Sequence, residues 1–558
     1  RELSLLFMQK FRWQLLIVFI TALVVGLILF FQQRTPQEET DVTPNPISGG
    51  SYTEALVGSF MRLNPMLDHF NQPDRDINRL LFSRLIHFDS NGLPVGDLAQ
   101  SWNVSDDGAV YLVNMRTNAV WHDGTPVTSQ DVIYTISLLQ SQSPLIPSSL
   151  QELWNTVTVN AISDATLEFS LPAAFAPFMD YLSFQILPAH LLGNLGINEL
   201  VDHPFNLAPI GSGPYRFESL ETENGVITGV NLQSYEYYFN GQPFIDEIRF
   251  RYYPDEKAAL DAYLEGAVDG LSKIANQDLQ TVLNQAGLNL YSSRQPRLSI
   301  VFLNLRNANA PTLQRAEFRK ALMAGINRQM MIDEVYQGQG VLAQGPIMPG
   351  NWAYYSEQTT YRYDPDGARQ LLAGMGLTLA ENGRFISDGA LIELTLLTPD
   401  DAQHLALAEI LRQNWEKIGI GVSISALPYD QVIANLQSRN YQMALVDIDL
   451  SDTPDPDPYQ FWAESQVDTG QNFSQWANTT ASSYLEQARQ TPDIEMRTRL
   501  YRNFQVLFDE DLPSLPLFYP IYNYAVKDSI KDLSFGPAYN PADRFNEVYK
   551  WYILTGVE

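Results

Sequence analysis

The sequence predicts an α/β protein, in which a globular body of strands and helices follows an N-terminal apolar segment. Apolar residues make up 45% and aromatic residues 12% of the 558 positions, which is typical of folded chains with large cores. Short runs rich in β-branched and aromatic residues alternate with stretches of helical periodicity, which indicates helices packed on sheets. Residues 13–31 are uncharged and almost wholly apolar. The length is sufficient for two to four domains.

The first predicted element is the apolar segment 13–31, WQLLIVFITALVVGLILFF. As a helix it extends about 28 Å, close to the hydrocarbon thickness of a bilayer. Basic residues precede the segment and acidic residues follow it, so the positive-inside bias places residues 1–12 in the cytoplasm. A cleaved signal peptide is the alternative, but its apolar core is usually shorter and no small-x-small cleavage site follows here. We therefore expect a single-pass anchor in the cell membrane and an extracytoplasmic body.

Residues 32–48 are polar and proline-containing, which predicts a linker between the anchor and the body. In the body, β-branched and aromatic content predicts strands over 110–115 and 166–171. A helix is predicted over 128–139, capped by Thr128 or Ser129 at its start.

Two longer helices are predicted in the second half of the chain. Over 318–335, apolar residues recur every four positions, and over 401–418 another apolar stripe does the same. Gly419 ends the second of these helices, and residues 420–425 (IGVSIS) follow as a strand.

The segment 447–462, DIDLSDTPDPDPYQFW, combines five aspartates, three prolines and three aromatic residues. Proline fixes its own φ and favours extended geometry in the residue before it, so the segment is predicted to be a stiff, extended loop. Fixed carboxylates beside aromatic faces can bind an amine or a metal cation. A calcium loop of the EF-hand type requires glycine at its sixth position, where this sequence has Asp452, so no metal is expected.

Composition and motifs exclude several classes of protein. A net charge of −29 argues against a nucleic-acid partner, and the absence of cysteine excludes disulfides, thiolate metal sites and a cysteine nucleophile. The sequence contains no Gly-x-Ser-x-Gly, His-Glu-x-x-His or phosphate-loop motif, and its six histidines are scattered. No cofactor and no catalytic residue are therefore predicted. An acidic glycoside hydrolase remains the alternative enzyme, since paired acids beside aromatic rings also occur there.

The segment 97–132, DLAQSWNVSDDGAVYLVNMRTNAVWHDGTPVTSQDV, resembles the signature of the family 5 extracellular solute-binding proteins. These are the peptide- and nickel-type receptors of ABC importers. Four further blocks fall in the family's order, namely 63–65 (LNP), 209–215 (PIGSGPY), 318–328 (FRKALMAGINR) and 418–420 (IGI) with the strand after it. The ordered set extends from about residue 50 to the C-terminus.

The resemblance implies a large, type II, two-lobed periplasmic-binding-protein-like fold with an extra subdomain, here on an N-terminal transmembrane helix. It implies a ligand enclosed between the lobes by hinge closure and delivered to ABC permease subunits. The implied borders are residues 49–84, 195–292 and 505–558 for lobe I, residues 85–194 for the extra subdomain, and residues 293–504 for lobe II.

The same resemblance implies site residues. Family members that bind peptides place an aspartate opposite the α-amine of the peptide, and Asp452 occupies that position here, with Asp455 and Asp457 beside it. The alternative for such acids is that they cap turns or stay solvated. Tryptophan usually lies a few residues before this aspartate in peptide receptors, whereas this chain has Asp449-Leu450.

Other candidates come from the residues themselves. Aromatic rings on loops can stack on a ligand, which makes Trp352, Tyr354 and Trp462 candidates, with packing between domains as the alternative. Arg294 and Arg297 lie just before a strand, where either can bind a ligand carboxylate or form a surface ion pair. The expected ligand is an oligopeptide, with an oligosaccharide as the alternative. A membrane-anchored structural subunit of a complex is the alternative of another class.

Overall fold

The computed structural model describes residues 46–89, 91–451, 454–536 and 538–554. The chain divides into two units, residues 1–47 and residues 48–558. The predicted anchor over 13–31, most of the predicted linker and the candidate Asp452 lie outside the described residues. In the part of the chain that the structure describes, no helix combines the length and the apolar character that crossing a membrane requires.

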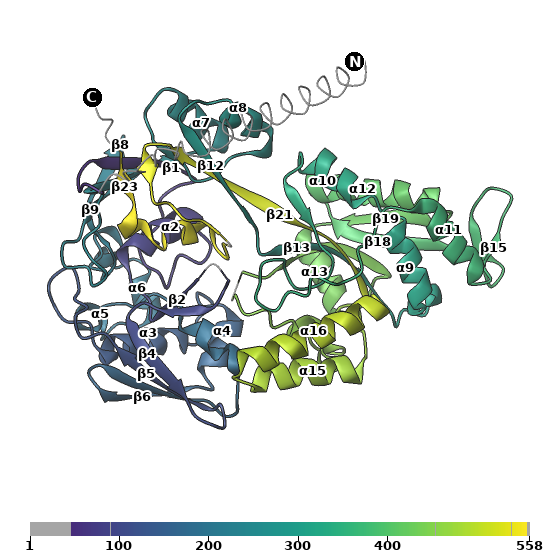
Figure 1. Ribbon diagram of the computed structural model, residues 1–558, viewed down its shortest axis with the longest axis horizontal. Helices are drawn as coiled ribbons and strands as arrows, with labels where there is room; N and C mark the ends of the chain where they lie inside the picture. The colour runs from purple at the N-terminus through teal and green to yellow at the C-terminus, as the bar shows by residue number, and fades with distance from the viewer. Residues whose placement is uncertain (1–45, 90, 452–453, 537, 555–558) are drawn as a thin grey trace, which may run out of the picture. The chain divides into compact units, whose positions relative to one another are not determined.

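A mixed, twelve-stranded sheet runs through the second unit (Figure 1). Its strand order is β19-β18-β20-β13-β21-β11-β1-β10-β9-β8, and β12 and β14 also pair with β21. Strand β1 is parallel to β10 and β11, and β18 is parallel to β19 and β20. The strand bounds are β1 Ser51–Val57, β8 Tyr215–Glu223, β9 Val226–Ser234, β10 Glu247–Tyr253, β11 Gly270–Leu271, β12 Leu288–Arg294, β13 Arg297–Leu303, β14 Gly340–Leu342, β18 Glu393–Pro399, β19 Gly421–Leu427, β20 Met443–Asp449 and β21 Ser514–Lys527.

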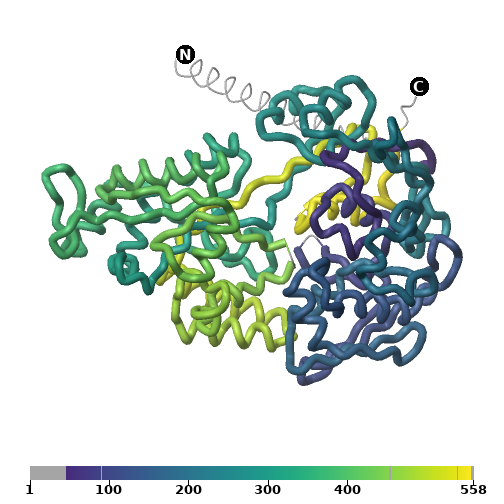
Figure 2. Tube along the Cα trace, turned by 180° about the vertical axis from the view of Figure 1, so that it is seen from behind, coloured from purple at the N-terminus to yellow at the C-terminus, as the bar shows by residue number. Residues whose placement is uncertain are grey.

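The long strand β21 joins two halves of this sheet. Its first part pairs with β13 and β14, and its second part, from Ile521, pairs with β12 and β11. The chain crosses beside it between β12 and β13, where the Gln295 N–H donates to the Pro520 carbonyl at 2.7 Å. Both views show these two crossings lying side by side (Figures 1 and 2). We name residues 48–294 and 521–554 lobe I, and residues 295–520 lobe II.

Lobe I has a core that contains Tyr52, Trp121 and Trp551, each at most 1% exposed. Its smaller sheets are β4-β5-β7-β6 (Ala99–Val104, Val110–Met115, Thr166–Ser170, Thr158–Ser163), β2-β3 (Ile86–Phe88, Pro94–Gly96) and β22-β23 (Ile530–Lys531, Tyr552–Ile553). Its helices are α2 Gln72–Leu81, α3 Ser129–Leu139, α4 Ser148–Trp154, α5 Ala189–Leu192, α6 Ile197–Leu200, α7 Glu256–Leu264 and α8 Leu279–Leu283, with 3₁₀ turns η1 Ala176–Leu182, η2 Pro204–Leu207, η3 Asn276–Asp278, η6 Pro541–Phe545 and η7 Val548–Lys550.

Lobe II has apolar cores that include Trp415 in one cluster and Trp462 in another. Its helices are α9 Ala316–Ala324, α10 Arg328–Val335, α11 Pro365–Gly374, α12 Ala402–Lys417, α13 Tyr429–Gln437, α14 Tyr459–Trp462, α15 Thr479–Gln490 and α16 Ile494–Asp511, with η4 Pro311–Gln314 and η5 Glu464–Gln466. A small sheet, β15-β16-β17, covers Thr378–Leu379, Phe385–Ser387 and Ala390–Leu391. The predicted domain borders stay a prediction, and the one at 504/505 falls within α16.

The structure confirms several of the elements that the sequence predicts. The strand over 110–115 is β5, and the helix over 128–139 is α3, which begins with a capping box between Thr128 and Asp131. Helix α12 begins after its N-cap, Asp401, and the chain then turns at Gly419 with φ +89°. The predicted end of the helix is confirmed. Glycine is favoured at this position because it adopts the left-handed conformation without steric cost.

Two predicted elements differ from the structure. The continuous helix over 318–335 is wrong, because α9 ends at Ala324 and α10 starts at Arg328. Gly325 is the C-cap of α9, and the Asn327 side chain accepts a hydrogen bond from the Met330 N–H and so starts a new helix. The extended loop predicted over 447–462 is shorter than expected, because β20 continues to Asp449 and α14 begins at Tyr459.

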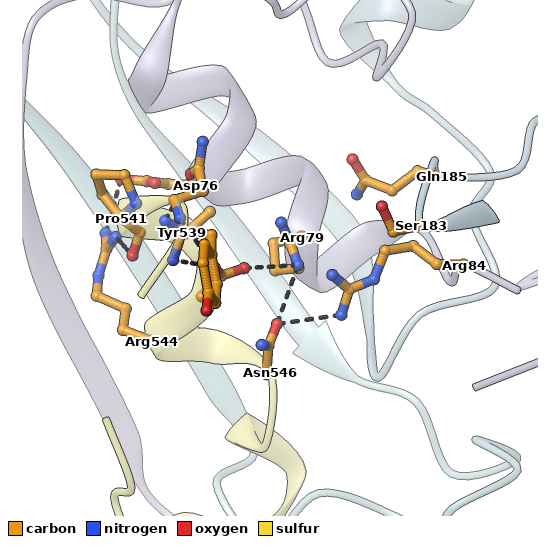
Figure 3. Close-up of polar contacts among 12 residues, drawn as sticks. Asp76, Arg79, Arg84, Ser183, Gln185, Tyr539, Pro541, Arg544 and Asn546 are labelled. Carbon is orange, nitrogen blue, oxygen red and sulfur yellow. Dashed lines mark hydrogen bonds and ion pairs between the residues drawn. The ribbon is translucent and has the colours of Figure 1, made fainter. Parts of the chain in front are cut away.

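A buried ionic cluster fixes the C-terminal segment on lobe I. Arg544 in η6 is 2.5 Å from Glu54 of β1 and 2.7 Å from Asp76 of α2, and the arginine and Glu54 side chains are fully buried. Beside this cluster, Arg79 and Arg84 converge on the Asn546 side chain at 3.0 and 3.1 Å (Figure 3). Arg544 also donates to the Pro541 carbonyl at 2.7 Å, and the Gln72 amide of α2 donates to Asn540 Oδ1 at 2.9 Å, so residues 540–541 lie against α2.

Candidate functional site

A cleft of about 490 Å³ lies between the two lobes, beside the strand crossings. This volume is within the usual range for sites that bind small ligands. Its walls carry both charged and aromatic side chains. The lining residues are Leu56, Val57, Gln72, Pro73, Arg75, Asp76, Ser272, Lys273, Tyr522, Ala538, Tyr539, Asn540 and Pro541 of lobe I, Arg294 to Arg297 at the crossing, and Asp449 and Ser451 of lobe II.

One polar atom of this cleft, the Arg294 Nε, is buried without a hydrogen-bond partner among the described residues. The Tyr539 hydroxyl also lies at the cleft; burial raises its pKa to about 12, and a hydrogen bond with the Asn351 side chain opposes that increase. The Asn351 amide further donates from Nδ2 to the Pro454 carbonyl and accepts at Oδ1 from the Ala353 N–H. Since an unpaired buried polar atom is costly, the Arg294 Nε favours a ligand that supplies an acceptor.

The other cations of the cleft each have an acidic neighbour. Lys273 lies 2.6 Å from Glu256, and Arg75 lies 3.8 Å from Asp68. Arg297 is 45% exposed and lies 3.7 Å from Asp447. Arg294, at the end of β12, forms no ion pair with any residue that the structure describes. In a chain of net charge −29, an arginine without a carboxylate is a strong candidate for binding an anionic group.

A second, smaller pocket of about 70 Å³ adjoins the cleft. Pro296, Asp449 and Tyr539 line both cavities, so the two lie side by side. The other lining residues come from lobe II, mainly from the loop that follows β20. They are Leu298, Pro346, Ile347, Met348, Asn351, Ile448, Leu450, Pro454, Asp455, Pro456, Asp457, Pro458, Gln460, Phe461 and Trp462.

The candidate acids of this loop form ion pairs inside the protein. Asp455 lies 2.6 Å from Arg497 of α16, and Asp457 lies 2.9 Å from Arg489 of α15. Burial raises the pKa of the Asp457 carboxyl to about 6. Both candidates therefore have cationic partners of their own.

The same loop contacts lobe I. The Asp455 N–H donates to Asp180 Oδ2, in η1, at 2.6 Å. Burial raises the pKa of the Asp180 carboxyl well above its usual value, and the nearby charge of Asp455 raises it further. Figures 1 and 2 agree that α15 and α16 lie against this part of lobe I. The contact thus joins the lobes on the side of the cleft away from the strand crossings.

The structure separates the predicted site residues into three groups. Arg294 and Arg297 line the cleft, whereas Asp455, Asp457 and Trp462 line the small pocket. Trp462 is 1% exposed and packs against Phe302 and Phe508, so its faces belong to the lobe II core.

The remaining aromatic candidates line neither of these two cavities. Trp352 packs against Arg497, whose guanidinium lies 5.1 Å from the ring centroid. Tyr354 is partly buried against the lobe II core. Asp452, the predicted partner of the amine, lies in the part of the loop outside the described residues.

Sequence reasoning missed most of the lobe I wall, including Gln72, Ser272, Lys273, Tyr522 and Tyr539. These residues come from segments hundreds of positions apart, and none lies in a recognisable motif. The segment around Tyr539 contains glycine, proline and asparagine, which indicates a loop but carries no sign of its position in the cleft. Among the described residues, no group of three or more histidines, aspartates and glutamates is arranged to hold a metal ion.

Residues 94–471 match the family described as bacterial extracellular solute-binding proteins, family 5 Middle. The match covers more than half of the chain. This chain belongs to that family. The family indicated by the ordered motifs is thus confirmed, and with it the prediction of a solute-binding protein rather than an enzyme.

Curated relatives and solved structures agree with this assignment. The chain is 25% identical over 519 residues to the oligopeptide-binding protein AppA of Bacillus subtilis, covering 91% of this chain and 92% of AppA. It is 24% identical over 478 residues to the dipeptide-binding protein of Escherichia coli, covering 81% and 86%.

Two solved structures show the fold. The structure of HbpA2 from Haemophilus parasuis has a TM-score of 0.80 at 19% identity and covers 91% of this chain and all of that one. AppA in complex with a nonapeptide has a TM-score of 0.65 at 24% identity and covers 91% of this chain and all of that one. The fold is therefore that of the two-lobed, mixed α/β periplasmic binding proteins.

Proposed function

We propose that this family 5 protein is the receptor of an ABC importer, which binds an oligopeptide between its lobes and delivers it to membrane permease subunits. The observation that carries the proposal is the cleft between the lobes, in which the Arg294 Nε is buried without a partner among the residues that the structure describes. A peptide supplies a carboxylate and backbone carbonyls, which can accept a hydrogen bond from this donor. The names of AppA and of the dipeptide-binding protein support the same class of ligand.

In this mechanism the lobes open and close about the two strand crossings at 294–297 and at β21. Arg294 lies at the first crossing, so a ligand carboxylate bound there contacts the hinge itself. Closure brings the loop after β20 over the ligand and excludes bulk water, which strengthens the charged contacts. Asp452 is proposed to bind the α-amine of the peptide from that loop.

The alternative ligand, an oligosaccharide, has weaker support. Sugar receptors stack ligand rings on exposed aromatic faces, but the Trp462 and Trp352 rings pack against other side chains of lobe II. Because these rings are engaged within lobe II, we do not propose that the protein is a sugar receptor.

We also propose that segment 13–31 anchors the body to the outer face of the cell membrane, and that residues 85–194 form the extra subdomain. Alkaline extraction of membranes tests the anchor. The protein is expected to stay with the lipid, and release of the intact chain into the soluble fraction would contradict anchoring.

Native mass spectrometry of the purified protein tests the class of ligand. Co-purified molecules released from the cleft should have the masses of oligopeptides. Release of a sugar without any peptide would overturn the proposal.

The amine contact has its own test. Asp452→Asn should weaken binding of a peptide with a free amine by about tenfold or more, because a charge-assisted hydrogen bond is lost. The same substitution should change the affinity for the N-acetylated peptide little. An equal loss for both peptides would show that Asp452 does not pair with the amine.

A further inference from the structure

A small cavity lies within lobe I and is separate from the cleft between the lobes. Its volume is about 30 Å³, which is room for two or three water molecules at roughly 10–15 Å³ each. One anion of the size of chloride fits the same space. The cavity shares no lining residue with the cleft. It is lined by Arg79, Phe82, Ser83, Arg84, His87, Asp97, Pro214, Tyr238, Asn240, Phe545, Asn546, Glu547 and Tyr549.

Arg84 gives this cavity a buried positive charge. The residue lies between α2 and β2 and is only 6% exposed. Its Nη2 donates to Asn546 Oδ1 at 3.1 Å, which is its only side-chain hydrogen bond to a residue that the structure describes. Arg79 has an acidic partner, Asp543, at 3.1 Å, whereas Arg84 forms no ion pair with any described residue. Because a buried charge without a counterion is costly, Arg84 favours an anion in the cavity.

Arg79 brings a second guanidinium to the same amide oxygen. Its Nη1 donates to Asn546 Oδ1 at 3.0 Å, so both arginines hold this oxygen toward themselves (Figure 3). The Arg79 Nε is buried and has no partner among the described residues. The Asn546 Nδ2 forms no hydrogen bond with a described residue either. The wall that these three residues form is therefore rich in N–H donors that lack acceptors.

Most other ionisable groups at the cavity add no net charge near neutral pH. Burial lowers the pKa of the His87 imidazole, so the ring is neutral. Burial raises the pKa of the Tyr238 and Tyr549 hydroxyls, so both stay protonated. Glu547 is paired with Lys550 at 2.5 Å.

Asp97 decides whether the charge of Arg84 is balanced. Its Oδ2 accepts a hydrogen bond at 2.9 Å from the backbone N–H of Arg84, not from the guanidinium. Burial raises the pKa of the Asp97 carboxyl to about 7, although the charges of Arg116 and Arg79 oppose this increase. Around pH 7 the carboxyl is therefore protonated in about half of the molecules. In those molecules the charge of Arg84 has no counterion among the described residues.

We propose that this cavity binds one small monovalent anion of the size of chloride, which accepts hydrogen bonds from Arg84 and Asn546 while Asp97 holds a proton. The anion and the proton bind together, because an ionised Asp97 repels the anion and a protonated one does not. The bound anion links the segment after η6 to the segment after α2 and so stabilises lobe I.

Thermal unfolding of the full chain in mild detergent tests the site. Replacing sodium gluconate, whose anion is too large for the cavity, by sodium chloride at constant ionic strength should raise Tm by about 1–3 °C at pH 6. Sodium bromide should act as chloride does. At pH 8 the affinity for chloride should be about tenfold lower, because the protonated fraction of Asp97 is lower by about that factor. The shift in Tm should shrink accordingly.

Three variants separate this site from general effects of salt. Arg84→Gln should remove the chloride-dependent shift, and Asp97→Asn should make the shift equal at pH 6 and pH 8. The matched control is Arg412→Gln, an exposed arginine on α12, which should keep the wild-type shift at both pH values. An equal chloride-dependent shift in Arg84→Gln and in the wild type would overturn the proposal.

Bromide locates the ion in the wild type and requires no variant. Crystals of the full chain grown with sodium bromide at pH 6 should show an anomalous-scattering peak in the cavity, within hydrogen-bond distance of the Arg84 guanidinium. A cavity without this peak, or a wild-type Tm that is the same in chloride and in gluconate at pH 6, would show that water alone fills the space and would overturn the proposal. The proposed peptide receptor stands in either case, since the cleft is separate from this cavity.

Discussion

Two buried clusters in this molecule have the same composition, one arginine and two carboxylates, but they lie in different places. One lies within lobe I, between β1, α2 and η6, and the other joins η1 of lobe I to α16 and the acidic loop of lobe II. We call them the lobe I cluster (Glu54, Asp76 and Arg544) and the interlobe cluster (Asp180, Asp455 and Arg497).

The two clusters differ in how their charges are paired. In the lobe I cluster, Arg544 contacts both carboxylates directly, and the hydroxyls of Tyr52 and Tyr524 also donate to Glu54. Every member is therefore bonded on several sides. Such a cluster holds three elements of one lobe in a single arrangement.

In the interlobe cluster, Arg497 contacts Asp455, and Asp180 is bonded instead to the backbone N–H of Asp455. Burial together with the charge of Asp455 raises the pKa of the Asp180 carboxyl. Because this contact between the lobes pairs no opposite charges, we expect it to separate at lower cost than the contacts of the lobe I cluster. We infer that a fully paired cluster stabilises the fold of one lobe, whereas a similar cluster with fewer ion pairs between the lobes lets them separate.

The largest effect is expected from breaking the lobe I cluster. Arg544→Met leaves two carboxylates buried without a cation and should lower the free energy of unfolding by about 3–5 kcal/mol. Differential scanning calorimetry measures the loss. The variant that combines Arg544→Met with Glu54→Gln and Asp76→Asn removes all the charges and should recover most of it. A single Arg544→Met variant as stable as the wild type would contradict the role assigned to the cluster.

The interlobe contact should affect ligand binding more than unfolding. Asp180→Ala leaves the Asp455 N–H without its acceptor in the closed state and should weaken peptide binding about tenfold. Asp180→Asn keeps an acceptor oxygen and should bind nearly as the wild type does. Titration calorimetry compares the two variants. A loss of unfolding free energy in Asp180→Ala without any change in affinity would assign this contact to stability instead.

The pH dependence of binding is expected to come from the interlobe cluster rather than from the lobe I cluster. Because the Asp180 pKa is raised in the closed state, the protonated carboxyl favours closure, and this contribution is lost as pH rises toward the raised pKa. The groups that face it are Asp455, Arg497 and Tyr539. Affinity should therefore increase as pH falls from 7 toward 5, by at most tenfold per unit for one proton. Asp180→Asn should reduce this slope, and an identical slope in both proteins would exclude Asp180 as its source.

The smallest effect is expected from a third cluster of one arginine and two acids, on the surface of α12. Arg412 lies 2.5 Å from Glu409 and 2.7 Å from Glu416, but all three side chains are 31–46% exposed. Arg412→Gln should change the free energy of unfolding by less than about 1 kcal/mol, because solvent screens these charges. Chemical denaturation measures the change. A loss as large as that of Arg544→Met would show that burial is not what distinguishes the clusters.

Local elements of the fold could be predicted from the sequence, whereas most of the site could not. The capping box of α3 and the glycine after α12 lie within a few residues of the elements they define, so their signals are local. Asp180 and Asp455 are 275 positions apart, and neither position carries a signal of the other.

The acidic loop shows the same limit. Its aspartates were recognisable as a group, but the arginines that neutralise Asp455 and Asp457 lie on helices later in the chain. Arg294 and Arg297 were both candidates from the sequence, which could not show that Arg294, unlike Arg297, lacks a carboxylate partner among the described residues. Pairing over long distances in the chain decides which charges remain available to a ligand.

In the proposed mechanism, a peptide carboxylate binds Arg294 in the cleft between the lobes. Titration calorimetry with one pentapeptide, as the free acid and as the C-terminal amide, tests it most directly in the wild type, in Arg294→Gln and in the control Arg297→Gln. We expect amidation to weaken binding to the wild type and to Arg297→Gln at least tenfold, and Arg294→Gln to bind both forms equally weakly. Equal loss on amidation in Arg294→Gln and in the wild type would exclude Arg294 as the carboxylate's partner.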